Sequence, residues 1–143
     1  MNKQSKQNYH NHKKYTPLYH FVLASIAPIG LIASVVYAFL EAFSFMSILL
    51  LGVWISVMIL VVLVRQFATK LQDRIIRQEE NFRHFILTNK RLDARLTLQQ
   101  IIALRFAEDE AFPALCVKAA ETGMHPDEIK KSVRSWRADH LRV

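Results

Sequence analysis

Two histidines near the N-terminus come closest to a metal-binding pattern in this chain. His10 and His12 lie two positions apart beside Tyr9, so both imidazoles could reach one ion. A zinc site needs further ligands and a backbone that fixes their geometry. No Cys or acidic residue lies near the pair, and the segment shows no helix or strand pattern. We therefore predict a solvated amphipathic segment, with no metal and no cofactor.

Other patterns of catalytic chemistry are missing from the sequence. The three glycines are isolated, so there is no Gly-rich phosphate loop. Neither Gly-x-Ser-x-Gly nor His-Glu-x-x-His occurs. The single cysteine, Cys116, excludes a disulfide framework, and we expect it to be a buried, reduced thiol. The sequence shows no catalytic constellation and therefore favours a non-catalytic protein over an enzyme.

Charge is distributed very unevenly along the 143 residues, of which 52% are hydrophobic. Residues 18–64 contain one charged side chain, Glu41. Residues 65–143 contain 15 Lys/Arg and 11 Asp/Glu, and residues 1–17 contain 4 Lys, which together give the net charge of +7. This division predicts a membrane protein with a cytoplasmic tail. Only 3 Gly and 4 Pro argue against an all-β fold, so we expect an all-α protein.

Two uncharged segments, 18–40 and 45–64, are each long enough to cross a hydrocarbon core of about 30 Å as a helix. The four residues between them predict an antiparallel transmembrane hairpin spanning 18–64. Two alternatives are a buried core helix and a signal peptide cleaved near Val36-Tyr37-Ala38. The length of the apolar segments disfavours both.

Orientation follows from the basic residues, which lie on both outer flanks of the hairpin and are missing from its turn. The positive-inside rule places both termini in the cytoplasm, in a multi-pass inner-membrane protein. The bilayer is thus the first expected partner. The basic residues predicted to meet lipid headgroups are Lys13, Lys14, Arg65, Lys70, Arg74 and Arg77.

Small residues recur in both segments, and they predict how the two helices pack. In a hairpin that turns near residue 42, facing positions have numbers that sum to about 85. Small faces that meet would allow close approach of the two backbones. Trp54 is an exception in the middle of its segment, and it needs either a partner or a lipid-facing position. The predicted packing residues are Gly30, Ser34, Ala38, Ser47, Gly52 and Ser56.

The second segment has no helix breaker before Thr88, which predicts one long helix over 45–88 with a juxtamembrane amphipathic part over 65–88. Apolar residues at spacings of three and four form a stripe along this part. Two interpretations remain open: a homodimer seam, or the cover for the tail helices. The stripe consists of Ala68, Leu71, Ile75, Phe82 and Phe85 or Ile86, with Gln78 in one gap.

The tail, residues 97–143, is predicted to hold three short helices. Thr97 and Gln100 form a capping box for the first, over 97–107. The second starts at the acidic run 108–110 and ends at Gly123, and the third covers 126–137. The predicted tail core consists of Ile101, Leu104, Leu115, Ile129, Val133 and Trp136.

Distinctive strings occur along nearly the whole chain. They are Asn8-Tyr9-His10-Asn11-His12, Pro17-Leu18-Tyr19-His20, Lys70-Leu71-Gln72-Asp73-Arg74-Ile75-Ile76-Arg77 with Glu79-Glu80, Leu98 to Ala107, Trp136-Arg137 and Asp139 to Val143. In these strings the chain resembles an uncharacterised bacterial membrane protein family, domain of unknown function 6526. The resemblance implies two spans and a helical tail, but no catalytic residue, ligand or partner. Ala138 stands where the family often has proline.

Three functions are consistent with the sequence. The favoured one is a non-catalytic, membrane-anchored interaction or scaffold protein with an unknown protein partner. A nucleic-acid-binding tail is disfavoured, because the 8 Lys/Arg beyond Leu92 are balanced by 8 Asp/Glu. A membrane enzyme without a recognisable motif is the third.

Overall fold

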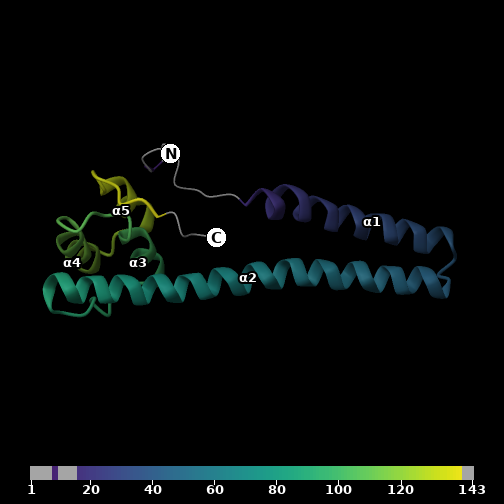
Figure 1. The fold of residues 1–143 in the computed structure, drawn as a ribbon, viewed down its shortest axis with the longest axis horizontal. Helices are drawn as coiled ribbons and strands as arrows, with labels where there is room; N and C mark the ends of the chain where they lie inside the picture. Colours follow the sequence, from purple (N-terminus) through teal and green to yellow (C-terminus); the bar gives the residue numbers. More distant parts are fainter. Residues whose placement is uncertain (1–7, 10–15, 140–143) are drawn as a thin grey trace, which may run out of the picture. The chain divides into compact units, whose positions relative to one another are not determined.

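The computed structural model describes residues 8–9 and 16–139, and the regular secondary structure in this part is helical (Figure 1). The fold is all-α, as predicted, and the second long helix continues far beyond its apolar segment. The described residues divide into a hairpin unit, residues 16–70, and a tail unit, residues 71–139 together with Asn8 and Tyr9. The elements in chain order are η1 (Leu18–Leu23), α1 (Ala24–Leu40), α2 (Phe45–Thr88), α3 (Leu98–Leu104), α4 (Phe112–Thr122) and α5 (Pro126–Ser132).

The hairpin turn reverses the chain without a glycine. Ala42 and Phe43 have φ values of 46° and 58°, in the left-handed region that most residues avoid. The Phe43 N–H donates to the carbonyl of Ala38 at 2.8 Å, which ends α1 in the manner of a C-cap. The Phe39 and Phe43 rings meet edge to face at 5.1 Å. These contacts hold the two left-handed residues in place, and Glu41 remains exposed in the turn.

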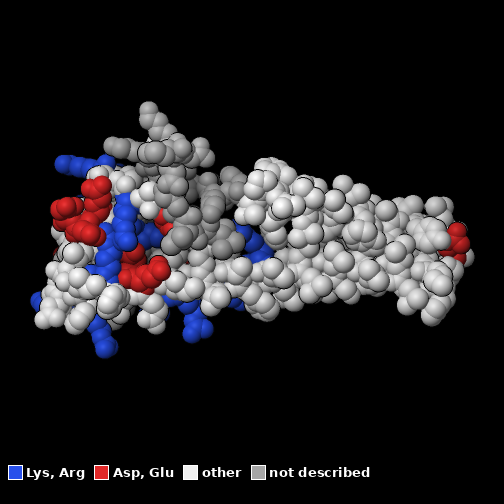
Figure 2. Space-filling model, in the orientation of Figure 1, with Lys and Arg blue, Asp and Glu red and all other residues white. Residues whose placement is uncertain are grey.

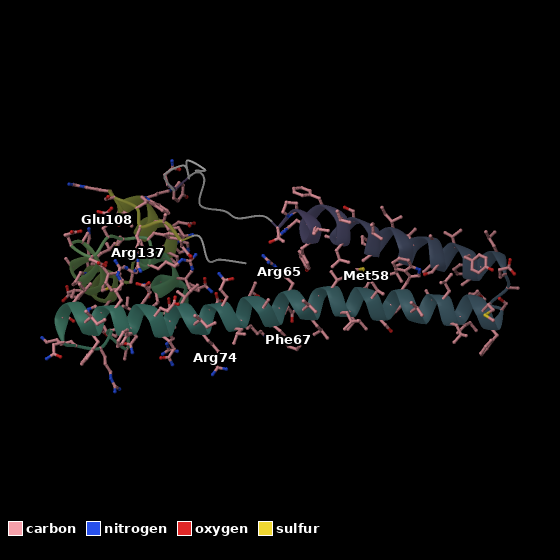
Figure 3. The ribbon with its side chains drawn as sticks, in the orientation of Figure 1. Met58, Arg65, Phe67, Arg74, Glu108 and Arg137 are labelled. Carbon is pink, nitrogen blue, oxygen red and sulfur yellow. The ribbon has the colours of Figure 1, made fainter. Side chains whose placement is uncertain are left out.

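Helix α1 presents small residues to α2, which presents both the small Ser47 and larger side chains. Ala27, Ser34 and Ala38 are buried on α1. A Cβ atom on Gly30 would overlap the six-membered ring of Trp54, so the indole occupies the space left by the glycine. Met58, one helical turn further along α2, also points toward α1 (Figure 3). Trp54 thus has a partner within the hairpin.

Two predicted packing residues, Gly52 and Ser56, do not lie at this contact. Both are exposed, nothing lies within 4 Å of a Cβ built on Gly52, and the Ser56 hydroxyl donates to the Gly52 carbonyl of its own helix at 2.8 Å. At 100° per residue, Gly52 lies about 140° around α2 from the buried Ser47. Gly30 instead faces Trp54, and their numbers sum to 84, close to the predicted register. At Gly30 the contact therefore pairs a small residue with a large one, whereas the buried Ser47 is a small residue of α2.

The apolar side chains of the hairpin are mostly uncovered. Both Leu18–Leu40 and Phe45–Thr88 contain an 18-residue window apolar enough to cross a membrane, and only 17% and 6% of those windows are buried. A core helix of a soluble protein would be mostly buried. Figure 2 shows the same division, with acidic and basic side chains gathered over the tail unit and a long uncharged surface along the hairpin helices.

The open end of the hairpin is tied by Tyr19. Its hydroxyl donates to the carbonyl of Val61 at 3.0 Å. The guanidinium of Arg65 lies 5.5 Å from the centre of the Tyr19 ring. A tyrosine with an apolar ring and a bonded hydroxyl is typical of the membrane–water interface.

Three short helices form the core of the tail unit. Each helix contributes a large, fully buried side chain: Leu104 of α3, Phe112 of α4 and Ile129 of α5. Thr97 and Gln100 form the predicted capping box of α3. Gly123 ends α4 with φ 62°, the left-handed conformation that favours glycine.

The tail helices are shorter than the sequence indicates. Helix α3 ends at Leu104, and the acidic run 108–110 lies in the turn before α4, which begins at Phe112. Helix α5 ends at Ser132, well before the expected residue 137. The reason is tertiary: Ala107 and Trp136 pair as a β-bridge, and the Arg137 N–H donates to the Phe106 carbonyl at 2.8 Å. Extended pairing replaces the last turn of helix there.

The two glycines of the hairpin give a matched test of its packing. We expect Gly30→Ala to destabilise the hairpin by about 1–3 kcal/mol, because the new methyl group overlaps Trp54. Gly52→Ala, which meets open space, should be neutral or stabilising by up to about 1 kcal/mol through helix propensity. Unfolding of the purified protein by titrating SDS into a mild detergent measures both. Equal effects of the two substitutions would contradict the packing described here.

Candidate functional site

The tail unit packs against a polar face of α2, and the predicted apolar stripe lies on the other side. Ile76, Glu80, Arg83 and His84 are buried. Leu71, Ile75, Phe82, Phe85 and Ile86 are 47–65% exposed. The interpretation of the stripe as a cover for the tail helices is therefore wrong. Arg74, which flanks the stripe, points away from α3, α4 and α5 (Figure 3).

Arg83 is the centre of the contact between α2 and the tail helices. Its Nη1 donates to Glu80 Oε2 at 3.0 Å, and its Nη2 donates to the carbonyl of Ala107 at 2.7 Å. Its Nε donates to Asp109 Oδ1 at 2.7 Å. The guanidinium also lies 4.2 Å from the centre of the Phe112 ring. One side chain thus joins α2 to the turn between α3 and α4.

Glu80 is the buried anion of this cluster. Burial raises the pKa of its carboxyl above the ordinary value of 4.5, and Arg83 and Arg137 oppose that rise. Arg137 Nη1 lies 3.8 Å from Glu80 Oε1, and Figure 3 shows Arg137 in the tail unit. Two guanidinium groups and the carboxylates of Glu80 and Asp109 therefore form one cluster of balanced formal charge.

A second ion pair holds the segment after α5. Arg105 Nε lies 3.1 Å from Asp139 Oδ2, and the Arg105 guanidinium lies 4.5 Å from the centre of the Phe106 ring. The Phe106 and Trp136 rings are 4.7 Å apart, and the indole N–H of Trp136 donates to the carbonyl of Val133 at 3.1 Å. Trp136 therefore anchors the tail internally.

Polar side chains at the end of α2 hold the connection to α3. His84 Nδ1 lies 2.8 Å from the Lys90 carbonyl, and its ring meets Phe112 edge to face at 6.0 Å. Asn81 Oδ1 accepts the backbone N–H of Leu92 at 3.1 Å. Asn89 has φ 55°, the left-handed turn that ends the helix. The buried polar side chains of α2 within the tail unit, Glu80, Arg83 and His84, thus all contribute to the fold of that unit.

Sequence reasoning missed Glu80, Arg83 and His84 as a group. Their spacing of three and one, with Ile76 four residues earlier, places them on one helical face. The same pattern would also describe a solvated charged face. Only the acceptors at Ala107 and Asp109, more than 20 residues away, distinguish the two cases.

The remaining predicted residues are placed as follows. His10, His12, Lys13 and Lys14 lie outside the described residues. Lys70, Arg74 and Arg77 are exposed on α2. In the tail core Ile101, Leu104, Ile129 and Val133 are buried, and Leu115 and Trp136 pack against them while partly exposed.

Cys116 belongs to the core of the tail unit. It is 2% exposed, and burial raises the pKa of its thiol to about 12. A neutral thiol is a poor nucleophile and a poor metal ligand. Within residues 8–9 and 16–139, no group of three or more His, Cys, Asp or Glu side chains could hold a metal ion.

A shallow groove of about 520 Å³ runs between α4 and the segment after α5. Its lining combines aliphatic side chains, among them Ala111, Leu115 and Val133, with polar ones that include Glu110, Lys118 and Arg134. Small-molecule sites combine such a lining with a few convergent polar groups. The ionic cluster around Arg83 is a separate feature, since neither Glu80 nor Arg83 lines the groove.

Removing the guanidinium group of Arg83 should destabilise the packing of the tail helices on α2. We expect Arg83→Ala to destabilise the tail unit by about 3–5 kcal/mol, because it leaves the Glu80 carboxylate buried without its main partner. Arg77→Ala, at an exposed position of the same helix, should change stability by no more than about 0.5 kcal/mol. Urea midpoints and the rate of trypsin cleavage within the tail measure both variants in detergent. If the two variants behaved alike, the Arg83 cluster would not hold the tail.

The raised pKa of Glu80 makes the stability of the tail depend on pH. The unfolded chain loses this proton near the ordinary value of 4.5, while the folded chain keeps it to a higher pH. Glu80 therefore lowers the free energy of unfolding as the pH rises from 4.5 through the folded pKa. We expect Glu80→Gln to remove that decline, whereas Glu110→Gln, at an exposed site, should keep it. Unfolding midpoints measured between pH 4 and 8 test this, and matching profiles for all three proteins would refute it.

Comparison with known proteins agrees with the resemblance of the sequence strings. No curated protein and no solved structure matches the chain. One family matches residues 1–143, which is the whole chain. The protein therefore belongs to the family of unknown function DUF6526.

Proposed function

We propose that this protein is a non-catalytic, membrane-anchored interaction or scaffold protein. The two apolar segments form the anchor in the inner membrane, and the tail unit is the cytoplasmic part. The observation that carries the proposal is the continuity of α2, which supplies both an apolar segment and the polar face that holds the tail helices. Anchor and tail thus share one helix.

The chemistry of the tail unit supports a structural role for its charged groups. Arg83 pairs with Glu80 and Asp109, and Arg105 pairs with Asp139. An acid–base or nucleophilic mechanism instead needs ionisable groups that face a substrate. Burial raises the pKa of the Cys116 thiol to about 12, which removes the one cysteine as a nucleophile at neutral pH. The internal pairing of these charged groups and the raised pKa of the Cys116 thiol favour binding over catalysis.

The surface charge of the tail also bears on its partners. Several basic side chains are engaged by acids of the same chain, including Arg137 with Glu80 and Lys130 with Asp127. Nucleic-acid binding draws on basic groups that are free to release counterions from phosphates. A protein partner fits this tail better than a nucleic acid does.

Reporter fusions test the anchor and its orientation. Fusions at Asn8 and at Val143 should both report the cytoplasm, because the basic residues flank the hairpin on these sides. A fusion in the turn at Glu41 should report the opposite side of the membrane. An external signal from the fusion at Val143 would refute the hairpin.

The interaction role is tested in native membranes. Cross-linking followed by purification of the full-length protein should recover it in a protein complex, and Arg83→Ala should reduce that recovery by disordering the tail. Purified protein that turns over a small molecule, with no protein recovered from the membranes, would overturn the binding role.

A further inference from the structure

One face of α2 is apolar and uncovered within the tail unit. Leu71 is 60% exposed, and Phe82 is 65% exposed. The α3, α4 and α5 helices pack on the opposite face, so they do not cover these side chains. We call the five positions of this face the α2 seam: Leu71, Ile75, Gln78, Phe82 and Phe85. Exposed contiguous apolar residues mark an interaction surface.

The spacing of the α2 seam is that of a two-stranded coiled coil. Successive positions lie four, three, four and three residues apart. In the heptad notation Ile75 and Phe82 occupy a positions, and Leu71, Gln78 and Phe85 occupy d positions. Because spacings of four and three alternate, all five residues stay on the same side of α2 over two heptads and can face one partner helix.

We infer that the α2 seam pairs with the same seam of a second copy, in a parallel homodimer. This inference rests on the proposed function in one respect: two copies anchored in one membrane with the same orientation can align their α2 helices only in parallel. Two heptads are short for a coiled coil in water. Confinement to one membrane raises the effective concentration of the two copies and offsets that shortness.

Charge complementarity identifies a second copy as the occupant. Arg74 lies just before an a position and Glu79 just after a d position, which are the g and e positions of the heptad. In a parallel pair, each g residue faces the e residue five positions further on in the other helix, and Glu79 is five positions after Arg74. Arg74 of each copy therefore faces Glu79 of the other. Both side chains are exposed, and neither forms an ion pair within the described part of its own chain.

Two other arrangements fit these charges less well. An antiparallel pair places g positions beside g positions and e positions beside e positions, so Arg74 of one copy would not face Glu79 of the other. An anionic bilayer surface would attract Arg74 but repel Glu79. The parallel pair is the arrangement that satisfies both charges.

Gln78 is the polar residue inside the seam. A side-chain amide carries both a donor and an acceptor, so two copies of Gln78 can bond to each other across a two-fold axis. A single polar residue in such a seam sets the register at some cost in stability. Gln78 is exposed in the single chain, so this pairing needs no rearrangement of the tail unit.

Cysteine cross-linking in native membranes tests the dimer on the full-length protein. Gln78→Cys should give a disulfide-linked dimer under mild oxidation, because facing d positions bring the two Cβ atoms close together. Arg77→Cys is the matched control, since it is exposed on the same helix but lies outside the seam. The native Cys116 is buried and should add no background. Equal cross-linking at the two sites would show random collision and overturn the proposal.

A charge exchange tests the parallel register. In the Gln78→Cys background, Arg74→Glu should reduce the dimer about fivefold, because it places an acidic side chain opposite Glu79 in each of the two symmetric contacts. Adding Glu79→Arg should restore the dimer. A fivefold loss that the second change fails to restore, or no loss at all, would overturn the register.

These outcomes are separable from the proposed function. If Gln78→Cys did not cross-link while the reporter fusions placed both termini in the cytoplasm and other proteins were recovered, the dimer would be wrong and the interaction role would stand. An external C-terminal fusion would instead refute the anchor on which the parallel pairing depends.

Discussion

The buried guanidinium of Arg83 determines how the tail is arranged on α2. A buried charge costs several kcal/mol unless it is paired and hydrogen-bonded on every side. Glu80 supplies one acceptor from the same helix, but Ala107 and Asp109 must come from the turn between α3 and α4. The face of α2 that carries Arg83 must therefore face the tail helices. The apolar stripe on the opposite side is consequently left uncovered.

This arrangement inverts the usual amphipathic helix, in which the apolar face packs inward. Phe112 explains how the tail helices can pack on a polar face of α2. Its ring contacts the Arg83 guanidinium and the His84 imidazole, so an aromatic residue of the tail core meets the polar side chains of α2. The apolar surface that α2 would otherwise bury within the chain is available to a second copy or to another partner.

In the bilayer that we propose for the hairpin unit, a different principle applies, because its neighbours would be lipid tails as apolar as its own side chains. There, association of two helices depends on shape rather than on the removal of water. The indole of Trp54 over Gly30 is such a fit, and the buried Ser34 and Ser47 hydroxyls donate to carbonyls of their own backbone. The two hydroxyl groups are thus satisfied within the chain and need no polar partner from the apolar surroundings.

Local chemistry in the sequence was sufficient to predict much of this protein. The two long apolar segments, the uninterrupted helix from Phe45 to Thr88, the capping box at Thr97 and the end of α4 at Gly123 all depend on residues close in sequence. Even the hairpin register was near the observed one, because the four-residue connection leaves little freedom.

Only the tertiary structure decided which faces meet. Helical spacing defines a stripe through Leu71 and Phe82 and equally a face through Glu80 and Arg83, but it does not state which of them packs on the tail. That choice depends on acceptors at Ala107 and Asp109, distant in sequence. The early end of α5 likewise depends on the pairing of Trp136 with Ala107. The sequence by itself determined the helices and their faces, whereas the partners of those faces were decided by long-range hydrogen bonds and ring contacts, which a local pattern does not encode.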